Sequence, residues 1–129
     1  MLGNILQRLP KPLRWGQCLL ALVIFIYYAL KPFHGPGGSV VFPAAMHYIG
    51  NVLLMLSVAV AFYPERPLWV LFTGSLIFSI SIEGTQALTA TRDANLFDVF
   101  TNALGIFTGL GMIKAMGYRK EEIIKPAES

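Results

Sequence analysis

Four long apolar segments, separated by short polar stretches, dominate the pattern of hydrophobic and polar positions along this 129-residue chain. They run from Trp15 to Leu30, Val40 to Tyr63, Pro67 to Ile82 and Val99 to Ile113. Alternation at period two, which a transmembrane barrel requires, is absent over any useful length. A helix crosses a membrane with about 20 residues, so the pattern predicts an all-α membrane protein, a four-helix transmembrane bundle in one domain. The predicted spans cover residues of about 15–31, 44–63, 67–88 and 98–115.

The composition supports this prediction. Hydrophobic residues make up 55% of the chain and charged residues 13%, whereas a soluble domain carries about a quarter charged residues. These figures exclude an intrinsically disordered chain, a disulfide-stapled secreted module and most soluble enzymes. The single cysteine, Cys18, has no partner within the chain, so a metal site built on thiolates is excluded as well. We expect no metal site and no cofactor.

The basic residues predict how the bundle is oriented. Eight of the ten Lys and Arg residues fall on one side of the predicted spans, and this bias indicates that both termini are cytoplasmic. The eight are Arg8, Lys11, Arg14, Arg66, Lys114, Arg119, Lys120 and Lys125. The first span lacks a small-residue cleavage site, so we expect a retained signal-anchor. The net charge of +3 reflects this topology, and no nucleic-acid partner is expected.

Polar side chains within the predicted spans gather near the outer end of the bundle. On each of the last three spans, two of these residues stand three or four positions apart and therefore share a helix face. Together with two basic residues they form a candidate ligand-binding cluster in the outer leaflet, and none of them is assigned a catalytic role. The cluster comprises Lys31, His47, Asn51, Glu83, Gln86, Arg92, Asp98 and Asn102.

A structural role for the cluster is the alternative interpretation. Ion pairs among its charged members, and hydrogen bonds among its amides, would stabilise helix packing without any ligand. Glu83 is expected one to two turns inside the end of its helix, where a lone carboxylate is costly and requires a partner. Its available partners are Lys31, His47 and Arg92.

These residues also resemble the signature of the VanZ-like family of small bacterial membrane proteins. In that family a Glu-x-x-Gln pair ends one helix, an Arg stands in the short loop, and Asp-x-x-x-Asn-x-x-Gly-x-x-x-Gly opens the next helix. The matching positions here are Glu83, Gln86, Arg92, Asp98, Asn102, Gly105 and Gly109. The upstream Lys31 and His47 extend the resemblance to about residues 31–113. Family members often carry an Asp-Lys pair shortly before the histidine, where this chain has Pro43 and Ala44.

The resemblance implies a bundle of transmembrane helices, commonly four in short members, in the bacterial cytoplasmic (inner) membrane. The family takes its name from a protein linked to low-level resistance to teicoplanin, a lipoglycopeptide antibiotic. No reaction defines the family, so the resemblance implies a process in the cell envelope rather than a mechanism. The Gly105 and Gly109 pair predicts close helix packing, either within the monomer or across a homodimer.

Our first functional hypothesis is a cell-envelope protein that binds a lipid or amphiphile headgroup at the outer leaflet, with Lys31 and Arg92 contacting an anionic group. The second is a small proton-coupled transporter that uses Glu83. The third is an intramembrane enzyme acting on a lipid phosphate through His47 and an acidic partner, but no nucleophile is obviously positioned. A scaffold whose polar residues all serve packing is the fourth. The expected partners are membrane lipids and a lipid-linked or amphiphilic ligand.

Overall fold

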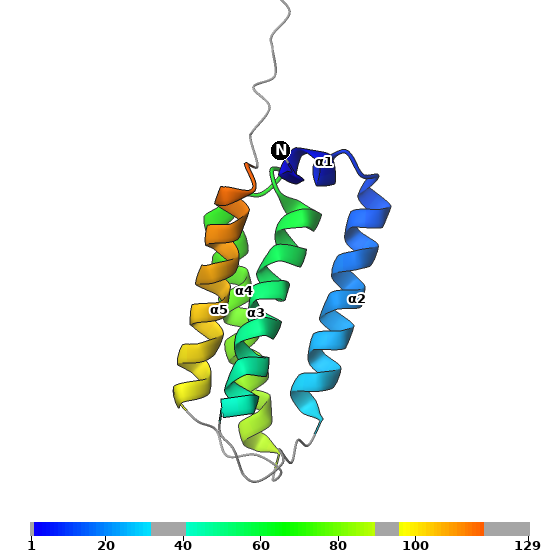
Figure 1. The fold of residues 1–129 in the computed structure, drawn as a ribbon. Coiled ribbons are helices and arrows are strands. Elements are labelled where there is room, and N and C mark those ends of the chain that lie inside the picture. The colour runs from blue at the N-terminus through cyan, green and yellow to red at the C-terminus, as the bar shows by residue number, and fades with distance from the viewer. Residues whose placement is uncertain (1, 32–40, 90–95, 118–129) are drawn as a thin grey trace, which may run out of the picture.

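The structure, a computed structural model, describes residues 2–31, 41–89 and 96–117. Five helices and no strand occur within these ranges, and four of the helices are long and apolar enough to cross a membrane. The helices are α1 (Leu2–Gln7), α2 (Lys11–Leu30), α3 (Val41–Phe62), α4 (Leu68–Leu88) and α5 (Leu96–Ala115). Figure 1 shows α2 to α5 side by side, with α1 across one end. The predicted all-α, four-helix transmembrane bundle is confirmed, and the orientation of the termini stays a prediction.

Backbone chemistry, rather than the position of charges, decides where the helices begin and end. Helix α2 begins at Lys11, four residues before the predicted span, because a proline such as Pro12 is tolerated in the first turn. Helix α4 begins directly after Pro67. After α5, Gly117 takes a φ of 67°, a left-handed conformation that glycine adopts without steric cost and that commonly ends helices.

Helices α3, α4 and α5 form the core of the bundle, and α2 lies at its periphery. The buried apolar cluster draws its members from these three helices: Met55, Ala59, Leu71, Ile106 and Ile113. Helix α2 buries only Arg14 and Cys18. It packs mainly against α3.

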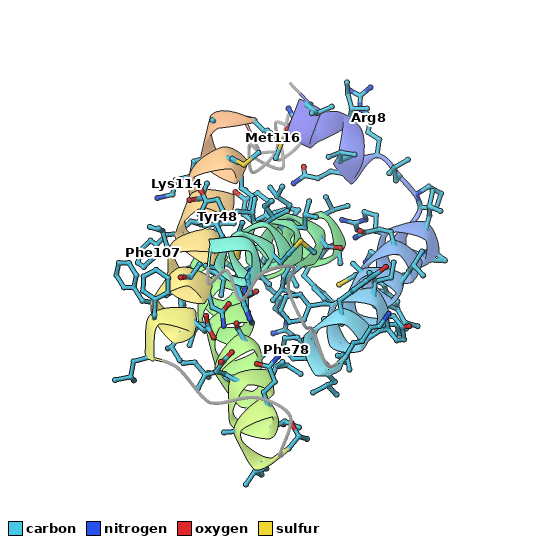
Figure 2. The ribbon with its side chains drawn as sticks, turned by 60° about the horizontal axis from the view of Figure 1, so that its bottom comes forward. Arg8, Tyr48, Phe78, Phe107, Lys114 and Met116 are labelled. Atoms are coloured by element: carbon cyan, nitrogen blue, oxygen red, sulfur yellow. The ribbon has the colours of Figure 1, made fainter. Side chains whose placement is uncertain are left out.

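Large apolar side chains point outward on all four long helices, and polar side chains are buried between them. Trp69 and Phe107 are exposed, and Figure 2 shows Phe107 projecting away from α5. In contrast, Asn51, Ser79 and Asn102 are buried. This distribution suits a bundle surrounded by lipid, in which polar groups find their partners inside the protein.

Two glycines allow α5 to approach α3 closely. A Cβ atom on Gly105 would lie 2.5 Å from the Tyr48 carbonyl oxygen, and one on Gly109 would lie 2.8 Å from the Met55 Cβ. Real Cβ atoms essentially never come so near another heavy atom. The Gly-x-x-x-Gly pair therefore packs within the monomer, against α3, which is the first of the two alternatives left open by the sequence.

Candidate functional site

The candidate site lies at the end of the bundle opposite α1, where α2 and α4 end and α3 and α5 begin (Figure 1). We call it the polar end and define it by six described residues of the predicted cluster. Four of them are buried, namely Asn51, Glu83, Gln86 and Asn102, and two are half-buried, namely His47 and Asp98. Arg92 lies outside the described residues. The helices therefore bring six of the eight predicted residues to one level, and Lys31 follows directly after α2 at the same end.

A chain of hydrogen bonds joins α3, α5 and α4 at the polar end. His47 Nδ1 lies 3.1 Å from Asn102 Oδ1, which also accepts a 2.8 Å hydrogen bond from Asn51 Nδ2. Asn102 Nδ2 in turn donates to Glu83 Oε2 at 3.4 Å. Glu83 is only 6% exposed, so this amide contact partly offsets the cost of burying its carboxylate. Asn102 stands between His47 and Glu83 and contacts both.

The other predicted residues make separate contacts. Gln86 donates from Nε2 to the carbonyl oxygen of Ala29 and so connects α4 with α2. Lys31 is exposed, and its ammonium lies 5.6 Å from the centre of the Tyr27 ring, in a cation–π contact. Asp98 lies in the first turn of α5. The predicted ion pair of Glu83 with Lys31 or Arg92 stays a prediction.

Two buried amide oxygens at the polar end, Asn51 Oδ1 and Gln86 Oε1, have no hydrogen-bond partner among the described residues. Further along α4, the hydroxyls of Ser75 and Ser79 are buried and unpartnered in the same sense. Both serines share a helix face with Glu83, at spacings of four and eight residues. The polar surface of α4 therefore continues from Glu83 toward the middle of the bundle.

A cleft of about 540 Å³ opens between α2 and α3 at the polar end. Its walls are mostly apolar, and the side chains with polar groups among its lining residues are those of Tyr28, Lys31 and His47. The residues that line it are Ile24, Phe25, Tyr28, Ala29, Lys31, Pro43, Met46, His47, Ile49, Gly50 and Leu53. An apolar cleft of this size with a few polar groups is typical of a small-molecule site.

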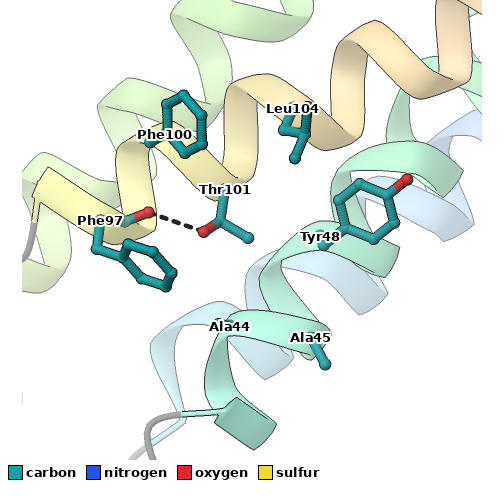
Figure 3. A pocket seen from close by; sticks show the side chains of 7 residues that line it. All are labelled: Ala44, Ala45, Tyr48, Phe97, Phe100, Thr101 and Leu104. Atoms are coloured by element: carbon teal, nitrogen blue, oxygen red, sulfur yellow. Dashed lines mark hydrogen bonds between the residues drawn. The ribbon is translucent and has the colours of Figure 1, made fainter.

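A second hollow, of about 430 Å³, lies between α3 and α5 (Figure 3). Tyr48 and Leu104 contribute to its walls, and the Thr101 hydroxyl donates to the Phe97 carbonyl oxygen at 2.8 Å. None of its lining residues is charged. This groove therefore lacks the group that would orient a polar ligand.

The arrangement limits what chemistry the site can perform. Within the described ranges, no three His, Cys, Asp or Glu side chains are placed to hold a metal ion. Three hydroxyls of the described residues adjoin cluster residues in sequence, and all three already donate a hydrogen bond: Thr85 and Thr101 to carbonyls of their own helices, and Tyr48 to Thr108. What the site offers is hydrogen bonding and charge, through His47, Lys31 and the buried amides.

Sequence reasoning missed a second polar network, at the α1 end. Arg14 was counted only as a topology signal, but it is 4% exposed, and its guanidinium donates to Glu65 Oε1 at 2.9 Å and to the carbonyls of Val60 and Tyr63. One turn further, Gln17 and Ser57 bond reciprocally across α2 and α3. The three-residue spacing of Arg14 and Gln17, which puts both on one helix face, is the signal that could have revealed it.

Fold and site together define a multi-pass membrane protein with a buried polar cluster at one end of a four-helix bundle. The VanZ/LLP1 family model matches residues 5–117, which is most of the chain, so the protein belongs to the VanZ/LLP1 family. The resemblance drawn from the residues of α4 and α5 is thereby confirmed. No curated protein and no solved structure matches the chain.

Proposed function

We propose that this VanZ-type membrane protein binds an anionic lipid or amphiphile, with the headgroup at the polar end and an acyl chain in the cleft between α2 and α3. The observation that carries the proposal is the cleft itself, since apolar walls combined with one cation match the chemistry of an anionic amphiphile. The other hollow lacks a charged group and fits this chemistry less well.

The positions of Lys31 and His47 along their helices support this assignment. Lys31 follows the last residue of α2, at the level where lipid headgroups meet water. His47 is six residues after the first residue of α3, which places it about 9 Å further along the helix axis. A headgroup near Lys31 would therefore have His47 within reach on the way to the acyl chain. Arg92 remains part of the proposal on sequence grounds alone, as a second cation for the same headgroup.

We place this site in the outer leaflet of the bacterial cytoplasmic membrane, on the strength of the uneven distribution of basic residues. A cell-envelope role follows, because lipid-linked precursors and amphiphilic antibiotics both meet a cell at that leaflet. Protection against a teicoplanin-type glycopeptide would then arise from binding at the polar end. Expression in a susceptible bacterium should raise the inhibitory concentration of teicoplanin, and a variant lacking the Lys31 charge should lose that effect.

Native mass spectrometry of the purified protein with phosphatidylglycerol and phosphatidylcholine tests the binding proposal. We expect the anionic lipid to be retained preferentially, and Lys31→Met to weaken its binding about fivefold, which corresponds to about 1 kcal/mol for one basic group near a headgroup. Lys114→Met is the matched control, because Lys114 is also an exposed lysine and lies at the opposite end of the bundle. Equal loss in both variants, or no preference for the anionic lipid, would refute the site.

One observation favours a second function, a small proton-coupled transporter. The unpartnered hydroxyls of Ser79 and Ser75 extend the polar face of α4 from Glu83 into the bundle, as a path for protons would require. In proteoliposomes with an imposed pH gradient, this function predicts uptake of a cationic probe such as ethidium. The uptake should be lost in Glu83→Gln and kept in Ser81→Ala, which alters an exposed hydroxyl on the same helix. Absence of uptake by the unaltered protein would eliminate it.

A further inference from the structure

We infer that His47 presents its Nε2 atom to the α2–α3 cleft as a hydrogen-bond acceptor, so that the site selects anionic amphiphiles whose headgroup carries a hydroxyl donor. The inference rests on the proposed lipid-binding function and specifies its ligand class. It is carried by the hydrogen bonds of His47, Asn51 and Asn102 together with the position of His47 in the cleft wall.

The backbone carbonyl of His47 determines the orientation of the Asn51 side-chain amide. The carbonyl oxygen of His47 can only accept, and it receives a 2.8 Å hydrogen bond from the Asn51 side chain. The Asn51 atom at this position must therefore be its nitrogen, Nδ2. The same nitrogen lies 2.8 Å from the Asn102 side chain, so the Asn102 atom that faces it must be the oxygen, Oδ1.

The contact of the Asn102 amide nitrogen with Glu83 is consistent with this orientation. Its Nδ2 atom faces the Glu83 carboxylate, which when ionised can only accept hydrogen bonds. With Asn102 oriented in this way, its Oδ1 atom also faces His47 Nδ1 at 3.1 Å. An amide oxygen requires a donor, so Nδ1 carries the proton. In the neutral imidazole the other nitrogen, Nε2, then has a free lone pair and accepts.

Nε2 is also the ring nitrogen that remains for a ligand. The one side-chain hydrogen bond of His47 within the described part of the chain is made by Nδ1, toward α5. His47 at the same time lines the cleft on the α2 side of α3. The buried amides thus hold the ring in one tautomer, with its acceptor available to whatever occupies the cleft.

The Lys31 ammonium and the Nε2 acceptor of His47 together indicate which headgroups the site would bind. The ammonium of Lys31 suits a phosphate, and an acceptor nearby suits a hydroxyl on the same headgroup, as in a phosphoglycerol or a phosphosugar. A headgroup that bears only a phosphodiester and an alkyl cap would satisfy Lys31 but leave Nε2 without a partner. The selectivity expected from one hydrogen bond is about three- to tenfold.

Two lipids of equal charge provide the test. Phosphatidylglycerol carries hydroxyl donors and phosphatidylmethanol carries none, so native mass spectrometry should show about three- to tenfold tighter binding of the former with matched acyl chains. His47→Phe should reduce phosphatidylglycerol binding to the level of phosphatidylmethanol. Met46→Leu, a change of similar volume in the same cleft wall, should preserve the difference.

A second measurement reports on the tautomer directly and does not require a variant at His47. In ¹⁵N NMR spectra of the His34→Gln protein, in which His47 is the one remaining histidine, neutral His47 should show a protonated Nδ1 and an unprotonated Nε2. Asn102→Leu should remove this preference.

The outcomes separate the two proposals. Equal binding of both anionic lipids above phosphatidylcholine, or a ring protonated at Nε2, would overturn the inference and leave the proposed function standing. No preference for either anionic lipid over phosphatidylcholine would refute the proposed function itself.

Discussion

Single residues at the interface of α3 and α5 set how closely these two helices pack. Gly105 faces the Tyr48 carbonyl and the Asn51 side chain, so its missing side chain brings Asn51 within reach of Asn102. Packing and site geometry are therefore connected at this position: a wider spacing of the helices would lengthen the amide contacts that orient His47.

Substitution of either glycine should therefore destabilise the bundle. Gly105→Ala and Gly109→Ala each force a methyl group into a contact below 3.0 Å, which we expect to lower the free energy of unfolding by about 1–3 kcal/mol. Gly111→Ala is the control, because a Cβ atom there would meet nothing within 4 Å. Thermal unfolding in detergent measures all three, and equal midpoints for Gly105→Ala and Gly111→Ala would contradict the packing described.

At the α1 end, one carboxylate makes stability depend on pH. Burial alone would raise the pKa of Glu65, but the hydrogen bond from Arg14 and the positive charges of Arg14 and Lys11 bring that pKa below its ordinary value. A lowered pKa in the folded state stabilises the protein above the unfolded-state pKa, and this contribution disappears as the pH falls through the folded-state pKa. The effect is modest, because the Glu65 side chain is 42% exposed.

The unfolding midpoint should therefore decrease more in the unaltered protein than in Glu65→Gln when the pH is lowered from about 6 to about 3, a range that spans the ordinary pKa of a glutamate. The difference between the two proteins isolates the Glu65 contribution from the other carboxylates. A constant difference over this range would show that Glu65 gains nothing from Arg14.

At the scale of helices, polar contacts toward both ends of α2 help to attach it to the bundle. Gln17 and Ser57 exchange hydrogen bonds at 2.9 and 2.6 Å near the α1 end, and Gln86 reaches the Ala29 carbonyl at the polar end. Between these two attachments lies the α2–α3 cleft. An amphiphile bound in the cleft would therefore lie between the two attachments.

Removal of one attachment should loosen α2. We expect Gln17→Ala to broaden the distribution of distances between spin labels at the outward-facing Leu19 and Phe107, because it removes two hydrogen bonds between α2 and α3 and interhelical hydrogen bonds in membranes contribute about 0.6 kcal/mol on average. Thr85→Val is the control, since its hydroxyl bonds only within α4. An unchanged distribution in Gln17→Ala would mean that the hydrogen bonds between Gln17 and Ser57 do not fix the position of α2.

The long helices were predictable from the sequence because hydropathy and length decide which segments cross a membrane. The starting residues were less predictable, since the first apolar segment begins at Trp15 whereas proline chemistry allows α2 to begin at Lys11. Helix α1 was not predicted at all. Its six residues are too few for a periodic pattern, and its position depends on long-range contacts such as the bond from the Gly3 amide to the Met116 carbonyl.

The sequence predicted which residues lie together at the polar end, but not which of them bond to one another. Spacing along each helix placed His47, Glu83 and Asn102 at one end, as the structure has them. The sequence favoured direct pairing of Glu83 with a cation or with His47, whereas an amide lies between Glu83 and His47. That arrangement depends on how closely α3 and α5 approach each other. The spacing of residues within a single helix carries no information about this distance between helices.

For the molecule as a whole, orientation in the membrane is the prediction on which the outer-leaflet site depends. Eight basic residues against two predict that both termini face the cytoplasm. Fusions of alkaline phosphatase to either terminus should be inactive in cells, and fusions of green fluorescent protein should fluoresce. Active phosphatase at the C-terminus would reverse the topology and move the polar end to the inner leaflet.

The most direct test of the central claim, that the polar end binds an anionic amphiphile in the α2–α3 cleft, is photolabelling with a phosphatidylglycerol that carries a diazirine in its acyl chain. The proposal predicts that mass spectrometry locates the label on cleft residues such as Met46 and Ile49, and that Lys31→Met reduces this labelling while Lys114→Met does not. Labels spread equally over the outward-facing Leu104 and Phe107 of α5, and unaffected by Lys31→Met, would contradict it.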